Sequence, residues 1–420
     1  MDEIREGEMA EAQSATQKRQ QLSKGMEHLR SVVTVDDLAE SAPNTVAETD
    51  KASTAFEPVR VLPHRSHDPG NNLKRSDPFQ FGSRYLEQGD NIFEFNAWDH
   101  VETDDAYKEF MESQYAKQRE SPVSEADKIK YNSAPETWWD KFYAVNTSNF
   151  FKNRNWLFQE FPVLKEVTQP TAGEKVLLEV GAGAGNTAYP ILANNENPTL
   201  RIHACDFSKK AVEVIRSNEA YDGKMVRADV WDVAGTGDAS LPPGIEAGTV
   251  DVILMIFIFS ALSPDQWAQA VRNIWTLLKP GGEVFFRDYG RGDLAQVRFR
   301  KGRYMGENFY VRGDGTRVYF MAKEELESIW SGDEEFWSQN RQNWRKSQAC
   351  QEDDGEKDIS TEHGEEAKER SEKKDQETME AMPKFDVLEV GVDNRMLVNR
   401  QRKLKMFRCW LQARFRKPKE

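Results

Sequence analysis

The glycine-rich stretch LEVGAGAGNTAYP, residues 178–190, is the first candidate for chemistry. Its glycines, Gly181, Gly183 and Gly185, follow an apolar run and precede a plausible helix, which is where α/β folds bind cofactors. A dinucleotide site needs the spacing G-x-G-x-x-G, with a helix N-terminus facing the pyrophosphate. Here the spacing is G-x-G-x-G and Glu179 precedes it, so a pyrophosphate would be repelled. The stretch favours a cofactor with a cationic centre and no phosphate.

S-adenosylmethionine is such a cofactor, and it predicts further groups along the chain. Asp206, in HACDFS, ends the next apolar run and is placed to accept hydrogen bonds from ribose hydroxyls. Asp229, after the third run, is placed to meet the adenine amine, and Ile256, on the fourth, to line the adenine face. Alone, the glycines indicate a tight turn and Asp206 a helix cap. Together they favour a methyltransferase, with a nicotinamide-dependent dehydrogenase as the alternative.

The elements that must position these groups alternate between strands and helices. Short apolar runs separated by helix-length segments indicate parallel strands covered on both faces. Ser208 is expected to cap one intervening helix, and Ser263 with Gln266 to form a capping box at another. We therefore expect an α/β fold with a doubly wound, mostly parallel, Rossmann-like sheet, preceded by a helical and aromatic extension. Its strands are expected at KVLLEVGAG, LRIHACD, KMVRADV, VDVILMIFIFS and GGEVFFRDYG, completed by FDVLEVGV and KLKMFRCWLQARF.

Composition divides the chain into segments. Residues 1–75 are polar and poor in aromatics, and residues 346–381 form an acidic insertion, so both are expected to be disordered. Aromatic density is high in residues 76–165, which suggests an extension that docks onto a domain. The methyltransferase domain is expected at residues 166–345 and 382–418.

Cysteine usage and the chain's ends bear on its compartment. The three cysteines form no C-x-x-C motif, the first residues are acidic, and no run of about 18 apolar residues occurs. We expect a cytoplasmic protein with no metal site and no membrane partner.

Two segments point to the substrate. Residues 287–320 hold eight Lys or Arg against four acids, and residues 395–420 hold ten against one, in a chain of net charge −14. Aromatic side chains are interleaved with these basic ones, which suits stacking on unpaired bases. The alternative for the second segment is an edge strand protected by its charges. RNA accounts for both segments together.

The chain resembles the eukaryotic tRNA cytosine-N3 methyltransferases, in the branch that acts on threonine tRNAs. The resemblance rests on FGSRYL with NAWDHV, WWDKFY, FFKNRNWLFQEFP, LEVGAGAGN, ACDFS, FRDYG and ENFYVRGDGTRVYF. It implies an enzyme that uses S-adenosylmethionine to form 3-methylcytidine at position 32 of the anticodon loop. It also implies that residues 76–165 bind tRNA and provide a lid.

The resemblance further implies roles for individual residues. An aromatic stripe such as WWDKFY more often packs in a core, and only the resemblance makes it a cofactor lid. In FFKNRNW, Asn153 and Asn155 stand where the family usually has Asp and His, so a charged or titrating role there is lost. The implied cofactor contacts are Trp139, Tyr143, Gly181, Asp206, Asp229, Val230 and Ile256, and the implied tRNA contacts are Phe151, Lys152, Arg154 and Arg312.

The chemistry of cytosine suggests catalytic residues. N3 of neutral cytosine carries an in-plane lone pair, so no strong base is required. Catalysis then rests on extruding the base, aligning N3 and stabilising the cation that forms. We expect Asp288 to stabilise that cation and Arg287 and Tyr289 to position the base; alternatively, Asp288 anchors a loop.

The sequence leaves other functions open. One is a scaffold of the same fold that binds RNA or a partner protein without catalysis. A protein or small-molecule methyltransferase is another, opposed by the basic, aromatic segments. Whether the enzyme needs an accessory protein is left open.

Overall fold

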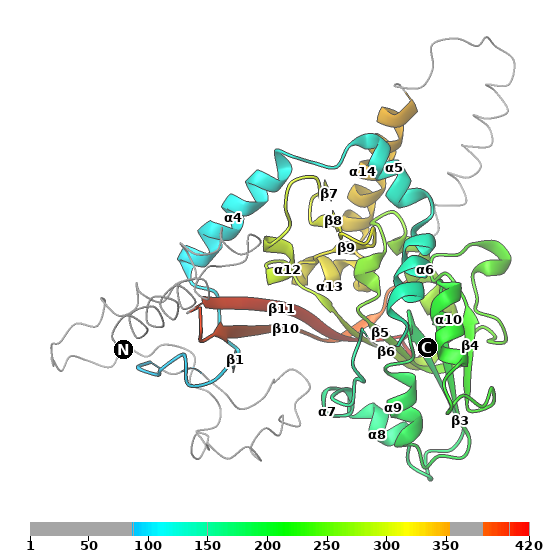
Figure 1. The fold of residues 1–420 in the computed structure, drawn as a ribbon. Coiled ribbons are helices and arrows are strands. Elements are labelled where there is room, and N and C mark those ends of the chain that lie inside the picture. Colours follow the sequence, from blue (N-terminus) through cyan, green and yellow to red (C-terminus); the bar gives the residue numbers. More distant parts are fainter. Residues whose placement is uncertain (1–85, 87, 149, 353–380, 403, 420) are drawn as a thin grey trace, which may run out of the picture. The chain divides into compact units, whose positions relative to one another are not determined.

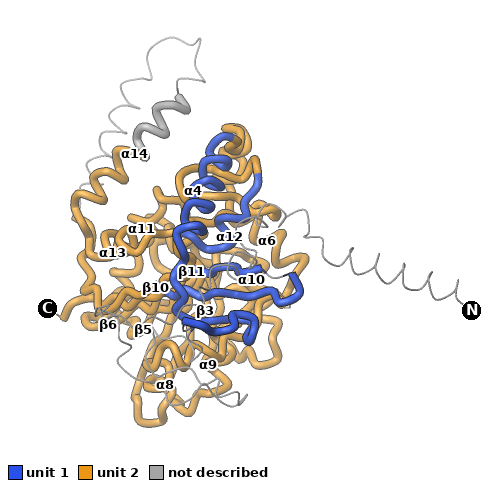
Figure 2. The backbone as a smooth tube through the Cα atoms, turned by 90° about the vertical axis from the view of Figure 1, so that its left-hand side faces the viewer, with its two compact units in different colours: residues 1–120, 292–300, 393–409 blue, residues 121–291, 301–392, 410–420 orange. Residues whose placement is uncertain are grey.

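A computed structural model describes residues 86, 88–148, 150–352, 381–402 and 404–419. The expected disordered tail, residues 1–75, and most of the acidic insertion lie outside the described residues, and the expected domain boundaries stay predictions. The chain forms two compact units, coloured separately in Figure 2. Unit 1 comprises residues 1–120, 292–300 and 393–409; unit 2 comprises residues 121–291, 301–392 and 410–420. Along the described stretches, no helix has the length and apolar character needed to span a membrane.

Unit 2 is built on the expected α/β sheet (Figure 1). Its strand order is β11-β6-β5-β2-β3-β4, in which β11 (Leu404–Arg416) runs antiparallel to β6 and the other neighbours run parallel. The strands expected from the sequence are all present, which confirms the doubly wound, mostly parallel fold. The parallel strands are β2 (Lys175–Val180), β3 (Leu200–Asp206), β4 (Val226–Val230), β5 (Val250–Ile256) and β6 (Leu278–Tyr289).

Both faces of this sheet are covered because successive side chains of each strand point to opposite sides. Leu178 belongs to a cluster with residues of α11 and α13, whereas the adjacent Leu177 packs among residues of α7, α8, α9 and α10. The sheet is thus buried on both sides, as its nearly continuous apolar strands require. The covering helices are α7 (Leu157–Glu160), α8 (Val163–Val167), α9 (Ala188–Ala193), α10 (Lys209–Arg216), α11 (Trp267–Leu277) and α13 (Lys323–Ser331).

The helix starts expected from the sequence are found in part. Ser208 Oγ accepts the Ala211 N–H at 3.1 Å and so caps α10 as expected. The Gln266 side chain accepts the Ser263 N–H at 3.1 Å, but α11 begins only at Trp267. The capping-box contact therefore stabilises the turn before the helix rather than its first residues.

Unit 2 also contains a small antiparallel sheet and further helices. The sheet has the order β7-β8-β9 and follows the long strand β6 in sequence. Its strands are β7 (Tyr304–Gly306), β8 (Phe309–Val311) and β9 (Arg317–Tyr319), and the remaining helices are α5 (Glu125–Ser133), α6 (Pro135–Asn146), α14 (Glu334–Glu352) and the short η3 (Gly237–Ala239) and η4 (Phe259–Ala261).

Unit 1 has its own core. Its helices are α4 (Asp105–Arg119) and α12 (Leu294–Val297). Its strands are β1 (Ala97–Asp99), the part of β10 (Asp386–Asn399) from residue 393 onward and the part of β11 up to residue 409. These strands lie in the order β1-β10-β11. Asp293 is fully buried, and its carboxylate accepts the N–H groups of Ala295 and Cys409 and pairs with Arg408. These bonds hold α12 against the strands of unit 1.

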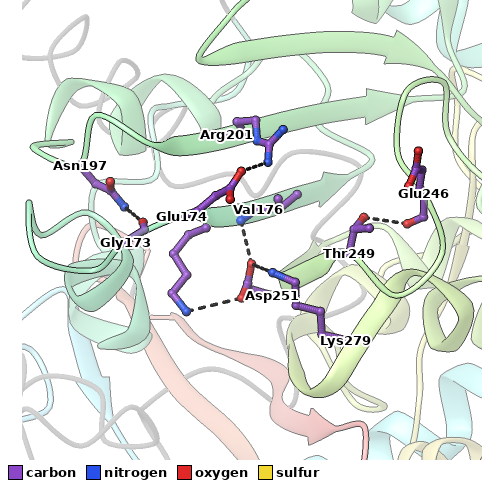
Figure 3. Close-up of polar contacts among 10 residues, drawn as sticks. Gly173, Glu174, Val176, Asn197, Arg201, Glu246, Thr249, Asp251 and Lys279 are labelled. Atoms are coloured by element: carbon purple, nitrogen blue, oxygen red, sulfur yellow. Dashed lines mark hydrogen bonds and ion pairs between the residues drawn. The ribbon is translucent and has the colours of Figure 1, made fainter.

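The amino ends of the parallel strands are joined by polar contacts (Figure 3). Asp251, at the start of β5, accepts the Val176 N–H at 2.9 Å and the Lys279 ammonium at 2.8 Å, and lies 3.5 Å from the Lys175 ammonium. Burial acts to raise the pKa of Asp251, but hydrogen bonds from Lys279 and Val176 outweigh it and hold the pKa below its ordinary value. The carboxylate therefore joins the ends of β2, β5 and β6.

We predict that Asp251→Asn lowers the free energy of unfolding at neutral pH by about 1 kcal/mol, because the variant loses charge-assisted bonds. A depressed carboxyl pKa contributes stability that is present above the unfolded-state pKa, about 4, and is lost as the pH falls through the folded-state pKa. Urea unfolding at about pH 7 and about pH 3 should show the difference from wild type shrinking at the lower pH.

The matched control is Glu174→Gln, which breaks the ion pair between Glu174 and Arg201 in the same region (Figure 3). Those side chains are 69% and 52% exposed, so the change should stay below about 0.5 kcal/mol. Equal losses in the two variants would contradict the role given to Asp251.

Candidate cofactor and substrate site

A cavity of ≈ 400 Å³ opens at the carboxyl ends of the parallel strands of unit 2. This is the edge of an open α/β sheet at which ligands bind. Ten of the fourteen site residues expected from the sequence line it, and four do not: Asp229, Val230, Arg287 and Asp288. The ten lining residues are Trp139, Tyr143, Phe151, Lys152, Arg154, Gly181, Asp206, Ile256, Tyr289 and Arg312.

The glycine loop and Asp206 form one wall. The Asp206 carboxylate accepts the Gly183 N–H at 2.8 Å and the Ser208 N–H at 2.9 Å. Burial raises the pKa of Asp206 to about 6, against the lowering effect of these two bonds. Each carboxylate oxygen has a further lone pair, so the group can still accept hydroxyl donors.

Helix α6 closes the cavity from outside the sheet. The Asp140 carboxylate accepts the Ser208 hydroxyl at 2.7 Å and the Lys210 N–H at 3.1 Å, which joins α6 to the start of α10. This attachment directs Trp139 and Tyr143 into the cavity. Tyr143 lies directly over the glycine loop: a Cβ added at Gly183 would be 2.4 Å from its hydroxyl oxygen.

The end of β4 carries Asp229 and Val230, next to the end of β3. Cys205 pairs with Asp229 and Asp206 with Val230 in the parallel ladder. Asp229 Oδ1 accepts a bond from Arg216 at 3.0 Å, whereas Oδ2 is buried and has no hydrogen-bond partner among the described residues. Val230 is 41% exposed, which is unusual for a large apolar side chain at a strand end. An unpaired acceptor beside an open apolar surface suits an aromatic ring that carries an amine, as adenine does.

Glu179 has a different environment from the one expected. It does not line the cavity, and its carboxylate accepts the Ala188 N–H at 3.1 Å and lies 3.4 Å from the Arg154 guanidinium. Burial raises the pKa of Glu179 to about 7, opposed mainly by Arg154. Arg154 also donates to Thr187 Oγ1 at 3.0 Å. The acid thus fixes the loop that carries Arg154 against the start of α9.

Arg287 and Asp288 are both buried behind the cavity wall. The Arg287 guanidinium lies 5.1 Å from the ring centroid of Trp156 and 5.1 Å from that of Trp410. The Asp288 carboxylate is fully buried and accepts the N–H groups of Ser260, at 2.9 Å, and Tyr289, at 2.8 Å. This geometry favours the loop-anchoring alternative for Asp288, and a catalytic role stays a prediction.

Several residues that line the cavity were not expected from the sequence. Asn186 and Phe207 follow predicted site residues closely, whereas Asp314 and Thr316 come from the turn between β8 and β9. Phe257 has a φ of 61°, a strained conformation for a non-glycine residue of the kind found at binding sites. Asn186, Phe207, Asp314 and Thr316 lie within motifs that carry the family resemblance, but the sequence assigned none of them a role at the site.

The part of the chain that the structure describes contains no group of three or more His, Cys, Asp or Glu side chains arranged to hold a metal ion.

Known proteins resemble this chain. A family model described as a methyltransferase domain matches residues 178–284. The tRNA N(3)-methylcytidine methyltransferase of Schizosaccharomyces pombe is 43% identical over 337 residues, which cover 80% of this chain and 92% of that protein. The tRNA(Thr) (cytosine(32)-N(3))-methyltransferase of Saccharomyces cerevisiae is 39% identical over 93% of this chain, which spans 54% of that longer protein. A Drosophila melanogaster tRNA N(3)-methylcytidine methyltransferase is 35% identical over 89% of this chain and 99% of its own length.

We predict that Gly183→Ala weakens binding of the cofactor at least about tenfold, because the new Cβ displaces the Tyr143 ring that closes the cavity. The matched control is Gly237→Ala. Both glycines have a φ of +59°, so the backbone strain is the same, but nothing lies within 4 Å of a Cβ at Gly237. Equilibrium binding of S-adenosylmethionine to the two variants measures the difference.

A double variant tests the cause. In Gly183→Ala with Tyr143→Phe the hydroxyl is absent, and the nearest ring atom lies 3.4 Å from the Cβ. Binding should recover in part relative to Gly183→Ala alone. Equal losses at Gly183 and Gly237, or no recovery in the double variant, would show that backbone strain rather than the tyrosine is responsible.

Proposed function

The chain belongs to the tRNA N(3)-methylcytidine methyltransferases, and on that premise we propose that it methylates N3 of cytosine 32 in the anticodon loop of threonine tRNAs with S-adenosylmethionine as the methyl donor. The observation that carries the proposal is the cavity whose lining brings Asp206, the glycine loop and the α6 aromatics together with the basic residues Lys152, Arg154 and Arg312. The relative from S. cerevisiae, whose name specifies tRNA(Thr) and cytosine 32, supports the choice of tRNA and position.

The donor end of the cavity fits S-adenosylmethionine. Asp206 would accept the ribose hydroxyls, and Asp229, which lies beside the cavity rather than in its lining, has in Oδ2 an unpaired acceptor that would suit the adenine amine. Ile256 lines the adenine face, and Trp139 with Tyr143 excludes water above the loop. When bound, the donor supplies an electrophilic methyl group on a sulfonium.

The same cavity also fits an extruded nucleotide. Lys152, Arg154 and Arg312 line the cavity and bring positive charge for phosphates, and Phe151 lies beside them. Phe150 also lines the cavity, is 58% exposed and lies with its ring centroid 4.8 Å from that of Phe151. Because N3 of cytosine attacks through a free lone pair, the residues here need only extrude, align and hold the base.

Two further expectations stay proposals. The cytoplasmic location is expected from the sequence alone, and the sequence leaves open whether an accessory protein takes part. Neither is needed for the chemistry proposed for the cavity.

The direct test is methyl transfer to purified threonine tRNA by the full chain. We expect 3-methylcytidine at position 32, mapped by mass spectrometry of nuclease fragments, and no transfer to the same tRNA carrying uridine there, because uracil N3 bears a proton. Binding of S-adenosylmethionine without methylation of any tRNA would contradict the proposed substrate. Absence of donor binding would instead support a non-catalytic scaffold.

The ionisation of Asp206 gives a pH dependence. Its pKa is about 6, and the protonated carboxyl loses acceptor capacity for the ribose hydroxyls. Donor affinity should therefore be constant above about pH 7 and fall by up to about tenfold per pH unit below 6. Calorimetric titration from about pH 5 to pH 8 measures this.

Asp206→Asn is the control for that profile. The amide does not titrate, so this variant should bind the donor more weakly than wild type and with a flat profile across the same range. A wild-type profile that is equally flat would exclude Asp206 as the titrating group.

A further inference from the structure

We propose that Asp314 recognises the exocyclic amine of the target cytosine and stabilises the positive charge that methylation places on the ring. The inference rests on the proposed function and assigns a residue to the recognition of the base. Its basis is the position of Asp314 in the cavity, the free oxygen that it presents and the chemistry of cytosine.

Two carboxylates line the cavity among the described residues, Asp206 and Asp314. Asp206 lies at the glycine loop, where it accepts two backbone N–H groups. Asp314 comes from the turn between β8 and β9, which also contributes Arg312 and Thr316 to the cavity wall. The acid that remains for the base is therefore Asp314.

The turn holds one oxygen of Asp314 and leaves the other available. Oδ1 accepts the Thr316 N–H at 2.9 Å and the Thr316 hydroxyl at 2.7 Å. Oδ2 has no partner among the described residues. The same turn is closed by hydrogen bonds from the Arg312 N–H to the Thr316 carbonyl, at 2.7 Å, and from the Gly315 N–H to the Arg312 carbonyl, at 3.1 Å.

The turn is also fixed from outside. Gly315 has a φ of +87°, and a Cβ there would lie 2.1 Å from the Trp138 ring, so the backbone packs directly on that ring. The Arg312 guanidinium donates to the Arg317 carbonyl at 3.0 Å and lies 5.7 Å from the centroid of the Tyr289 ring. Asp314 is thus an exposed carboxylate on a constrained turn, which orients its free oxygen before substrate binds.

Asp288, the acid expected from the sequence to stabilise the cation, has a different role in the fold. Its two oxygens each accept a backbone N–H, from Ser260 and Tyr289, and the side chain is fully buried. Both of those residues line the cavity. Asp288 is therefore a positioning residue that holds the wall on which the base rests.

The chemistry of cytosine requires an acceptor of this kind. When N3 donates its lone pair to the methyl carbon, the carbon–sulfur bond breaks with its electron pair on sulfur, and the ring becomes a cation whose charge is shared with the exocyclic amine. A carboxylate that accepts a hydrogen bond from that amine stabilises the charge. Uracil presents a carbonyl oxygen there, which a carboxylate repels, so the same contact discriminates between the two bases.

The test is Asp314→Asn in the full chain. Asparagine keeps an oxygen for the Thr316 donors and replaces the free oxygen by an amide that cannot accept from the amine. We expect kcat/KM for threonine tRNA to fall on the order of 100-fold. The dissociation constants of S-adenosylmethionine and of the tRNA should change by less than about threefold, since neither depends mainly on this contact.

The same assay uses a tRNA with a pyrimidin-2-one nucleotide at position 32, which is cytidine without the exocyclic amine and keeps the N3 lone pair. Wild type should methylate it more slowly than cytidine, and Asp314→Asn should cause little further loss on it, because the contact is already absent. The proposal is wrong if Asp314→Asn lowers kcat/KM by the same factor on the pyrimidin-2-one tRNA as on the cytidine tRNA. It is also wrong if Asp314→Asn methylates the cytidine tRNA at the wild-type rate.

Other outcomes separate the possible failures. If Asp314→Asn lowers donor or tRNA binding as much as it lowers kcat/KM, Asp314 only shapes the turn and the proposal is wrong. If the variant does not fold, the pyrimidin-2-one substrate still tests the proposal on wild type, since an undiminished rate would exclude recognition of the amine. If wild type does not methylate cytosine 32, the proposed function itself fails.

Discussion

The hydrogen bonds from the Gly183 and Ser208 backbones to the buried Asp206 carboxylate are the interaction on which the site depends. Removing a carboxylate from water costs several kcal/mol unless donors replace the water. Two backbone N–H groups do so here, each contributing about 1.5–3 kcal/mol. Because these groups belong to the glycine loop and to the start of α10, satisfying the carboxylate fixes the shape of both. The pKa of Asp206 still lies above its ordinary value because burial outweighs the two bonds.

Ser208 extends this constraint to the wall that comes from outside the sheet. Its N–H bonds to Asp206, while its hydroxyl donates to Asp140 and accepts the Ala211 N–H. A strand end, a helix start and α6 therefore meet at one small residue, which is fully buried. Placing Tyr143 over Gly183 follows from this attachment, and the absence of a Cβ at the glycine makes the close approach possible.

Three carboxylates near the cavity have three environments. Asp206 is held by two N–H groups in the cavity wall, Asp288 is fully buried behind the wall, and Asp314 lies on an exposed turn with one oxygen engaged. A reaction in which N3 of cytosine attacks directly needs no proton abstraction. The acids are consequently arranged to bind and orient, and the basic residues beside them supply the charge for a nucleic acid.

The sequence by itself determined the parts that depend on local pattern. Apolar runs, glycines at a strand end and the acid that ends the next strand predict the sheet, the loop and Asp206, because parallel strands place their carboxyl ends at one edge. The structure alone decided which acid faces the cavity. Asp288 and Asp314 both follow aromatic, basic segments in sequence, but the first is buried by Ser260 and Tyr289 and the second is presented by a turn packed on Trp138. The contacts with Ser260 and with Trp138 join residues far apart in the chain, and side-chain burial and orientation depend on such contacts, which no local pattern encodes.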